Sequence, residues 1–338
     1  MAVSIEDVAR RAGVSRGTVS HVINGNVAAR IAASTQERVW KAVSDLGYHP
    51  NRIARSLGRR RTDIVGLIIP SLTNPFFVQI MESMEQLALK EGYQVLLDAM
   101  QPISSSGKPV AKLQGWPVDG VLMWSTDALH SLVQMLGAQA GEVPVVYLGG
   151  HPRQDNTDSV YFDVYRGAVD MMNHLVEKGF RKIGFLYPFD WVLEQEDEPR
   201  QNAYTKVCQE SGIEPLMIRM EIQEETRRAG LVAGIELAKM DRNEAPEVVL
   251  CFNDIVAEGV LFGLRRGGLK VPDDMGVVGI DGIQTAQYLD TPLTTVRLPT
   301  EQMCSEALRI LLRRIAEGTS APAIELAIAP ELVKGATA

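Results

Sequence analysis

The sequence predicts a small all-α domain followed by a larger α/β part that contains two doubly wound parallel sheets. Three observations predict this fold class. Short amphipathic helical patterns fill the first 50 residues, apolar strands then alternate with helices, and the same alternation restarts near residue 160. A chain of 338 residues also exceeds the usual size of one hydrophobic core, so two or three domains are expected.

Charge is distributed unevenly along the chain. Residues 1–61 contain 11 Lys+Arg and 4 acidic residues, whereas the whole chain contains 34 and 42. The basic start indicates a segment that meets a polyanion, although a solvated basic terminus would have the same composition. The hydrophobic content of 46% and the charged content of 22% are ordinary for a folded globular protein.

Several protein classes are not expected from the sequence. No stretch approaches the roughly 20 apolar residues that span a bilayer, and the acidic start at Glu6 and Asp7 does not fit a signal peptide. The three cysteines and five histidines show no metal spacing, so we expect buried reduced thiols and neither a metal nor a cofactor. Dinucleotide, P-loop and nucleophile-elbow motifs are absent, so we expect no enzyme activity.

The first helix is predicted between Ser4 and Gly13. Ser4 can cap its start, with Asp7 three residues later as a capping partner, and Gly13 can end it in a left-handed conformation. Its apolar residues fall on one face, at Ile5, Val8, Ala9 and Ala12.

A second helix is predicted over 16–23, with Ser15 as its cap. Val19, Val22 and Ile23 can face inward. The opposite stripe is polar and free of acids, and consists of Arg16, Gly17, Ser20, His21 and Asn24. Two short helices joined by a glycine-containing turn, with an exposed polar stripe on the second, predict a helix-turn-helix.

A third helix is predicted over 34–47, with a capping box from Ser34 to Glu37 and a stop at Gly47. Its apolar residues Val39, Val43 and Leu46 would close a small core. Pro50 then breaks the helix, and residues 51–57 can form one or two further turns within a basic linker. This last helix is too short to be stable alone, so we expect it to form conditionally.

From Ile64 onward, apolar strands alternate with helices. Expected strands of the first half are 64–70, 94–99, 120–124 and 144–149, with helices at 76–91, 108–115 and 129–140. Expected strands of the second half are 182–188, 216–222, 247–252 and 276–281, with helices at 164–178, 199–211, 225–240 and 254–266. Two α/β halves are typical of ligand-binding proteins, with the ligand outside the carboxyl ends of the strands. The segment 293–315 is expected to be an extended crossover followed by a packing helix.

These motifs together resemble the LacI/GalR family of bacterial repressors. The resemblance begins with "IEDVARRAGVSRGTVSHVING" and "TQERVWKAVSDLGYHPNRIARSL" in the basic segment. It continues through "IVGLIIPSLTNPFF", "HLVEKGFRKIGFL", "CFNDIVAEGVLFGLRRGGLKVPDDMGVVGIDGI" and "TPLTTVRLPTEQM", so it covers essentially the whole chain. The order and spacing of many motifs make it specific, although none of them would suffice alone.

The resemblance implies a division into a DNA-binding head, a hinge and an effector core. We expect the helix-turn-helix head over 1–49, a hinge helix and linker over 50–62, and a periplasmic-binding-protein-like core over 63–338. Within the core, one subdomain is expected from 63–160 with 292–325, and the other from 161–291 with 326–338.

The resemblance also implies which head residues meet DNA. Arg16, Gly17 and His21 match the positions that read base edges in the major groove, with Ser20 on the same stripe. Phosphate contacts are expected from Ser4, Ser15, Thr18 and Asn24, while simple helix capping remains an equal alternative for Ser15.

In the hinge, Leu57 is expected to insert into the minor groove and bend the operator. A contact between Leu57 and the effector core is the alternative. The hinge helix that carries Leu57 would begin near Asn51, with Ile53 and Ala54 packing on the same helix pair.

For the effector, the resemblance implies contacts at Phe76, Trp124, Asp163, Arg200, Asn253 and Asp281. A flat aromatic face at Phe76 or Trp124 suits a sugar ring or a base, although either can alternatively be a core residue. Arg200 could hold a hydroxyl or a carboxylate. Asp281 can alternatively be a helix cap or a turn residue, and Asp254 can alternatively cap the next helix. Two positions depart from the family pattern, Ala203 and Gly282, where a glycine and a second acid are common.

The resemblance therefore predicts a ligand-responsive, sequence-specific transcriptional regulator, a repressor of sugar or related metabolic genes. It implies a homodimer or tetramer on a double-stranded palindromic operator, with a sugar or sugar derivative as effector. The expected location is the cytoplasm, and the nucleoid when DNA is bound, with no membrane partner. A secreted sugar-binding transport protein is the alternative for the core, but it leaves the basic head without a role.

Overall fold

The structure is a computed structural model, and it divides into two compact units, Met1–Thr62 and Asp63–Ala338. The residues that it describes are 3–23, 30–48, 61–99, 117–124, 143–150, 157–188, 198–221 and 226–338. Most of the expected hinge, together with the helices expected at 108–115 and 129–140, lies outside these residues.

The smaller unit contains the three predicted helices, α1 (Ile5–Ala12), α2 (Arg16–Ile23) and α3 (Ala33–Leu46). The capping box between Ser4 and Asp7 is present, which confirms the predicted start of α1. Helices α1 and α3 end at Gly13 and Gly47, both with positive φ, as predicted. The core of this unit is built on Val8, Val19 and Val39, which are fully buried.

The capping box predicted at Ser34 is wrong. Helix α3 already begins at Ala33, and its N-cap residue, Ala32, makes no side-chain capping bond. The side chain of Gln36 instead donates a hydrogen bond of 2.8 Å to the carbonyl oxygen of Ile31. Sequence signals place helix ends only to within one or two residues, and the start of α3 differs from the prediction by that margin.

The first sheet of the larger unit has six strands in the order β11-β5-β4-β3-β1-β2, and every described pair in it is parallel. Its strands are β1 (Ile64–Ile69), β2 (Gln94–Ala99), β3 (Gly120–Trp124), β4 (Val145–Gly149), β5 (Ser159–Phe162) and β11 (Glu325–Ile328). Helices α5 (Pro75–Lys90) and α13 (Thr300–Glu317) pack against each other and against this sheet. Strands β5 and β11 were not recognised as strands from the sequence.

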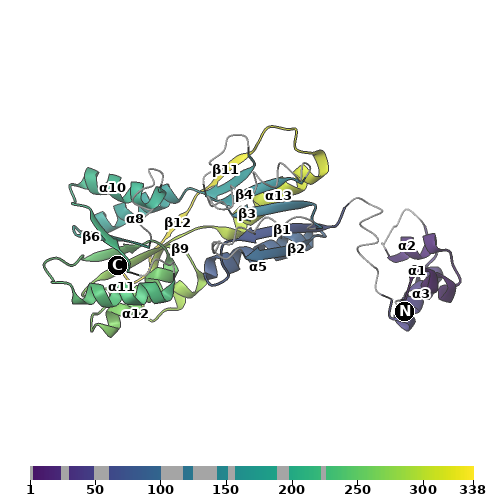
Figure 1. The fold of residues 1–338 in the computed structure, drawn as a ribbon, viewed down its shortest axis with the longest axis horizontal. Coiled ribbons are helices and arrows are strands. Elements are labelled where there is room, and N and C mark those ends of the chain that lie inside the picture. The colour runs from purple at the N-terminus through teal and green to yellow at the C-terminus, as the bar shows by residue number, and fades with distance from the viewer. Residues whose placement is uncertain are drawn as a thin grey trace, which may run out of the picture. The chain divides into compact units, whose positions relative to one another are not determined.

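The second sheet has the order β12-β10-β9-β8-β6-β7, parallel except for the β10–β12 pair. Its strands are β6 (Ile183–Tyr187), β7 (Leu216–Arg219), β8 (Val248–Cys251), β9 (Gly276–Asp281), β10 (Thr294–Arg297) and β12 (Glu331–Val333). Helices α8 (Val164–Glu177) and α10 (Pro199–Ser211) cover one face, and α11 (Arg227–Lys239) and α12 (Asp254–Arg266) cover the other (Figure 1). A short 3-10 helix, η2 (Gln284–Tyr288), follows β9.

Helices α11 and α12 pack backbone to backbone. A Cβ atom on Gly259 would collide with the carbonyl oxygen of Arg227, and one on Gly230 would collide with that of Val256. These glycines are therefore required by the close approach of the two helices.

The chain passes between the two sheets three times, after β5, after β10 and after β11. The expected subdomain limits need correction at these points. Strand β10 pairs in the second sheet, although 292–325 was assigned to the first, and β11 pairs in the first sheet, although 326–338 was assigned to the second. Strand β5 likewise extends past residue 160 into the second expected segment. A four-residue strand gives too little periodicity to show which sheet it joins.

Buried ionic contacts complete the first subdomain. The guanidinium of Arg314 in α13 binds both carboxylate oxygens of Asp158, at 2.7 and 2.8 Å, and also the carbonyl oxygen of Pro322. This pair joins α13 to the start of β5. Among the described helices, none is long and apolar enough to cross a membrane.

Candidate functional site

The polar stripe predicted on α2 is present on the surface of the smaller unit. Arg16, Gly17 and His21 are exposed, and Thr18 and Ser20 are half-buried. Val19 and Val22 point into the core from the opposite face. The core therefore fixes α2 so that its acid-free stripe faces outward.

Arg16 has a partner that the sequence did not suggest. Its guanidinium lies 3.0 Å from the carboxylate of Glu6 on α1, and both side chains are more than half exposed. An ion pair this exposed contributes at most about 1 kcal/mol, so a stronger anionic or polar partner can replace Glu6.

The hydroxyl groups near α2 organise the helix starts. The Ser15 hydroxyl accepts the amide of Thr18 at 3.1 Å and also lies 2.9 Å from the Thr18 hydroxyl. The Ser4 hydroxyl donates to the Asp7 carboxylate at 2.6 Å, and this bond holds the pKa of Asp7 below its usual value. Capping is thus a role of Ser4 and Ser15 in the structure, and their phosphate contacts stay predictions. The other predicted DNA contacts, Asn24, Asn51, Ile53, Ala54 and Leu57, lie outside the described residues.

The topology of the larger unit creates two switch points. Strand β1 lies between β2 and β3 in the first sheet, and β6 lies between β7 and β8 in the second. Ligands of doubly wound sheets bind outside the carboxyl ends at such points. Phe76 and Trp124 stand at the ends of β1 and β3, whereas Arg200 and Asn253 follow β6 and β8.

Aromatic rings gather at the carboxyl end of the first sheet. The ring centroid of Phe76 lies 5.6 Å from that of Trp124 and 6.1 Å from that of Phe162, both edge to face. Phe77 also packs on Trp124, at 5.0 Å. A Cβ on Gly149 would overlap the Trp124 indole, so the glycine makes room for the ring. Phe77 and Phe162 were missed by the sequence analysis, since their neighbours in space come from distant elements.

Phe76 is only 2% exposed, whereas Trp124 is half-buried. In the structure Phe76 is therefore a core residue at the sheet end, and Trp124 is the ring with accessible surface. An effector contact at either position stays a prediction.

Charged side chains gather at the carboxyl end of the second sheet. The guanidinium of Arg200 donates a 2.8 Å hydrogen bond to Glu198 and lies 4.3 Å above the ring of Phe252. Glu198 is buried and caps α10 by accepting the amide of Gln201 at 2.7 Å. Glu198 and Phe252 were also missed, although an acid directly before a proline-initiated helix is a readable capping signal.

Two of the predicted effector residues act as helix caps. Asn253 accepts the amide of Val256 at 3.1 Å and caps α12, while Asp163 accepts the amide of Arg166 at 3.0 Å and caps α8. The alternative that Asp254 caps this helix is therefore wrong.

Asp254 instead ties together three segments of the second sheet. Its carboxylate accepts the amides of Gly282 and Ile283, at 2.7 and 3.0 Å, and the hydroxyl of Thr295 at 2.6 Å. The residue is fully buried, and burial raises its pKa to about 7, although the three hydrogen bonds oppose the shift. Glu258 adds to the increase through its negative charge.

Asp281 ends β9 in a conformation that L-residues rarely adopt, with φ of 132°, and it is 4% exposed. The next residue, Gly282, has φ of 72°, and a Cβ there would lie 2.6 Å from the Cα of Arg297. A side chain at this position would collide with Arg297, which favours the glycine found here. Such local strain often marks a functional position.

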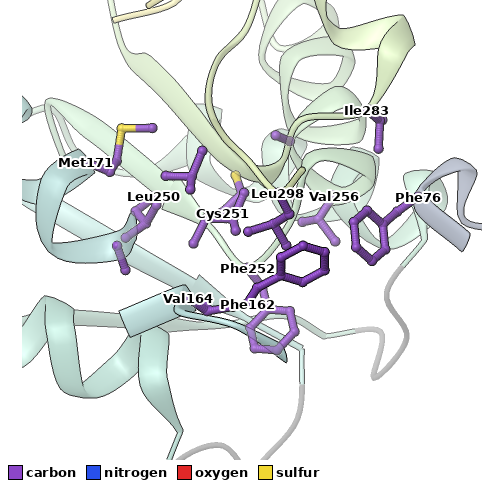
Figure 2. Close-up of a cluster of buried hydrophobic side chains, with 14 of the residues drawn as sticks. Phe76, Phe162, Val164, Met171, Leu250, Cys251, Phe252, Val256, Ile283 and Leu298 are labelled. Carbon is purple, nitrogen blue, oxygen red and sulfur yellow. The ribbon is translucent and has the colours of Figure 1, made fainter. Parts of the chain in front are cut away.

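The structure brings three of the six predicted effector residues, Phe76, Trp124 and Arg200, to one region. Figure 2 shows Phe76, Phe162 and Phe252 in one buried cluster, to which strands of both sheets contribute. Trp124 adjoins this cluster through Phe76, and Arg200 adjoins it through Phe252.

One cavity among the described residues adjoins this cluster, because Ile283 and Leu298 belong to both. It measures about 680 Å³ and is lined by segments such as 282–287, 297–302 and Glu331. None of the six predicted effector residues lines this cavity. Within the described part of the chain, no group of acidic, histidine or cysteine side chains is arranged to hold a metal ion.

A helix-turn-helix unit followed by two parallel-sheet subdomains defines a class of regulatory proteins in which a DNA-binding head precedes a periplasmic-binding-protein-like core. Comparisons with known proteins agree with this class. Residues 4–51 match the family model of bacterial regulatory proteins of the lacI family, and residues 172–338 match the periplasmic binding protein-like domain.

Relatives named as repressors match over most of the chain. The HTH-type transcriptional repressor PurR of Vibrio atlanticus is 33% identical over 316 residues and covers 92% of each chain. The repressor of the same name from Photobacterium profundum is 32% identical, again over 92% of each chain.

Solved structures share the fold. The lac repressor dimer bound to operator and the anti-inducer ONPF gives a TM-score of 0.83 at 24% identity, covering 100% of this chain and 99% of that one. The complex of the transcriptional regulator CelR with cellobiose gives a TM-score of 0.69 at 31% identity, covering 99% and 100%. The chain therefore belongs to the lacI family of bacterial regulatory proteins, and it is a DNA-binding transcriptional repressor.

Proposed function

We propose that this repressor binds a palindromic operator as a homodimer and that a small effector changes its affinity for DNA. The observation that carries the proposal is the acid-free stripe of α2, which faces outward from a basic unit. This unit precedes a core whose two sheets each have a switch point. A second copy would supply the second recognition helix for the other half-site. The similarity to a lac repressor dimer on its operator supports this arrangement. Relatives that are repressors also support a binding role without catalysis.

The proposed effector is a sugar or sugar derivative that regulates genes of its own metabolism. Aromatic rings suit the apolar face of a sugar ring, and the hydrogen-bonding groups of Arg200, Asn253 and Asp281 suit its hydroxyls. The similarity to CelR, whose structure contains cellobiose, supports this choice. Because a flat aromatic face also accepts a nucleobase, free nucleobases belong in any panel of candidate effectors.

On DNA, Arg16 would exchange Glu6 for a guanine. A bidentate bond to guanine O6 and N7 contributes about 1–3 kcal/mol of discrimination. His21 would contact a neighbouring base or phosphate, and Gly17 would allow close approach of the helix backbone to the bases. Leu57 would wedge into the minor groove at the operator centre, and the hinge helix would form only there.

The effector would act by preferring one of two states of the core. A ligand shifts such an equilibrium only through its different affinities for the two states. The three crossovers are the segments that must accommodate any change between the two sheets. We further propose that the protein acts in the cytoplasm, at the nucleoid when DNA is bound.

Recovery of genomic fragments tests the DNA-binding proposal. The purified full-length protein is mixed with short genomic fragments at physiological salt, and the bound fragments are sequenced. We expect a palindromic site with two half-sites. Recovery without any shared sequence, even with a metabolite pool present, would overturn the operator proposal.

Two arginines of the head provide a matched pair of variants. Arg16→Ala should lose roughly 1–3 kcal/mol of operator binding and relax the preference at one base pair. Arg10→Ala removes an exposed arginine on α1 and should weaken binding only slightly and equally for all sequences. Equal effects of the two variants in a binding titration would contradict the base contact of Arg16.

Leu57→Ala tests the hinge. Loss of the wedge should weaken operator binding and reduce DNA bending, measured by gel mobility of circularly permuted fragments, while effector binding is retained. An equal loss of both activities would contradict the minor-groove role.

A further inference from the structure

Glu198 and Arg200 form a buried ion pair at the start of α10. The Glu198 side chain is 4% exposed and that of Arg200 is 18% exposed, and the donor and acceptor are 2.8 Å apart. This pair differs from exposed surface pairs of the chain such as Arg265–Asp290, with side chains 65% and 91% exposed. At such depth, charges act with little screening.

The position on the helix makes Glu198 important. The N-terminus of α10 carries a partial positive charge, and Arg200 adds a full one in the first turn. Without a carboxylate, these two positive charges would make a favourable site for a phosphate or carboxylate. Glu198 occupies that place, because it binds both the Arg200 guanidinium and the amide of Gln201.

A second anion at this place would meet the Glu198 carboxylate. Two negative groups within a few ångströms in a poorly solvated region repel strongly, and one of them must take up a proton or remain outside. A neutral hydroxyl or amide has no such penalty, and it can still bond to a guanidinium that is already paired. The ring of Phe252 covers one face of the Arg200 guanidinium, so that face is closed to a ligand.

We propose that Glu198 is a specificity-determining residue that closes the effector site to anionic ligands, so that the effector is an uncharged polar molecule. This inference rests on the proposed role of Arg200 in effector binding. It favours a neutral sugar or an uncharged ring over a sugar phosphate or a sugar acid.

Inorganic phosphate is the probe that tests this proposal without knowledge of the effector. Binding of phosphate to the full-length protein is measured by isothermal titration calorimetry at constant ionic strength, with chloride as the reference anion. The variants are Glu198→Gln, which keeps an amide oxygen as cap, and Glu198→Ser, which keeps a good N-cap residue. The double variant Glu198→Ser with Arg200→Met removes both charges.

We expect both single variants to bind phosphate at least tenfold more tightly than the unmodified protein does. The double variant should lose this gain, because the positive partner is gone. Circular dichroism confirms that each variant is folded, and Glu198→Ser serves as the test if Glu198→Gln does not fold.

Three results would overturn the proposal. Equal phosphate binding by the unmodified protein and by the single variants would show that Glu198 excludes no anion. Absence of binding in all variants, or a gain that survives in the double variant, would show that Arg200 does not create an anion site. None of these results affects operator recovery by the unmodified protein, so failure of this inference and failure of the DNA-binding proposal are separate.

Discussion

The carboxyl ends of the two sheets have the same topology and opposite chemistry. In the first sheet the switch point is filled by rings, with Phe76, Phe162 and Trp124 packed edge to face. In the second, charged and amide groups surround the ring of Phe252, with Glu198 bonded to Arg200. Since the backbone path is nearly the same, the difference comes from the residues that follow each strand.

This contrast separates two ways of holding a site in place. Rings are positioned by packing, which is insensitive to pH and depends on side-chain volume. Buried polar groups are positioned by hydrogen bonds. Each buried donor or acceptor needs a partner, because one without a partner destabilises the folded protein. A ligand between the two ends would therefore meet an apolar face on one side and directed hydrogen bonds on the other.

The largest effect is expected from the ring cluster of the first sheet. Phe162→Ala should lower the free energy of unfolding by about 3–5 kcal/mol, because it leaves a cavity among rings that cannot fully collapse. Urea denaturation followed by circular dichroism measures the change. Phe162→Leu is the matched control and should cost less than about half as much. Similar losses of unfolding free energy in both variants would mean that side-chain volume at residue 162 does not stabilise the carboxyl end of the first sheet.

A smaller loss is expected from the buried carboxylate of the second sheet. Asp254→Ala removes the acceptor of two buried amides and of the Thr295 hydroxyl, and should cost about 3 kcal/mol. The same denaturation experiment applies. Asp254→Asn keeps one side-chain oxygen and should lower the free energy of unfolding by less. An unchanged free energy of unfolding in Asp254→Ala would contradict the view that hydrogen bonds to this carboxylate hold the second sheet end in place.

The pH dependence of stability sharpens the contrast further. Burial raises the pKa of Asp254 to about 7, so the folded protein holds a proton that the unfolded chain, with a value near 3.8, has released. The resulting stabilisation is complete below about pH 4 and is lost as the pH rises through 7. Between pH 8 and pH 6, the unmodified protein should gain about 1 kcal/mol relative to Asp254→Asn.

Denaturation midpoints of both proteins across this pH range provide the measurement. Other titrating groups, such as His174, are present in both proteins and cancel in the difference. Thr295 and Glu258 also face Asp254, and Thr295 can accept a hydrogen bond from the protonated carboxyl. A pH-independent difference, or a gain toward high pH, would contradict the raised pKa.

Among the substitutions that test stability, the smallest effects are expected from the two helix caps. Asn253→Ala, at a cap that is 2% exposed, should cost about 1–2 kcal/mol, whereas Asp163→Ala, at a half-buried cap, should cost about 0.5–1 kcal/mol. Thermal unfolding of the two variants side by side measures both. The reverse order would mean that burial does not strengthen the polar contacts of the second sheet.

Much of the fold could be predicted from local pattern. Strands β2, β3 and β9 and helices α10 and α12 have the predicted limits, because each is a continuous apolar or periodic run with clear end signals. The short strands β5, β11 and β12 were missed, since three or four residues carry little periodicity.

The candidate site was predicted only in part. Phe76, Trp124, Arg200 and Asn253 could be singled out because each lies at or after a recognisable strand and matches a family motif, and their effector contacts stay predictions. Glu198, Phe252 and the three bonds of Asp254 could not, because they depend on which distant segments meet in space.

The sequence by itself determined the order of the domains, the family and the limits of the predicted recognition helix, since these depend on residues close together in the chain. Tertiary structure decided which sheet each crossover strand joins. It also decided that Glu198 pairs with Arg200, and that Asp254 joins the segment after β9 to strand β10. The physical reason is that charge pairing and burial depend on distances between atoms. Those distances arise only when segments separated by tens or hundreds of residues pack against one another.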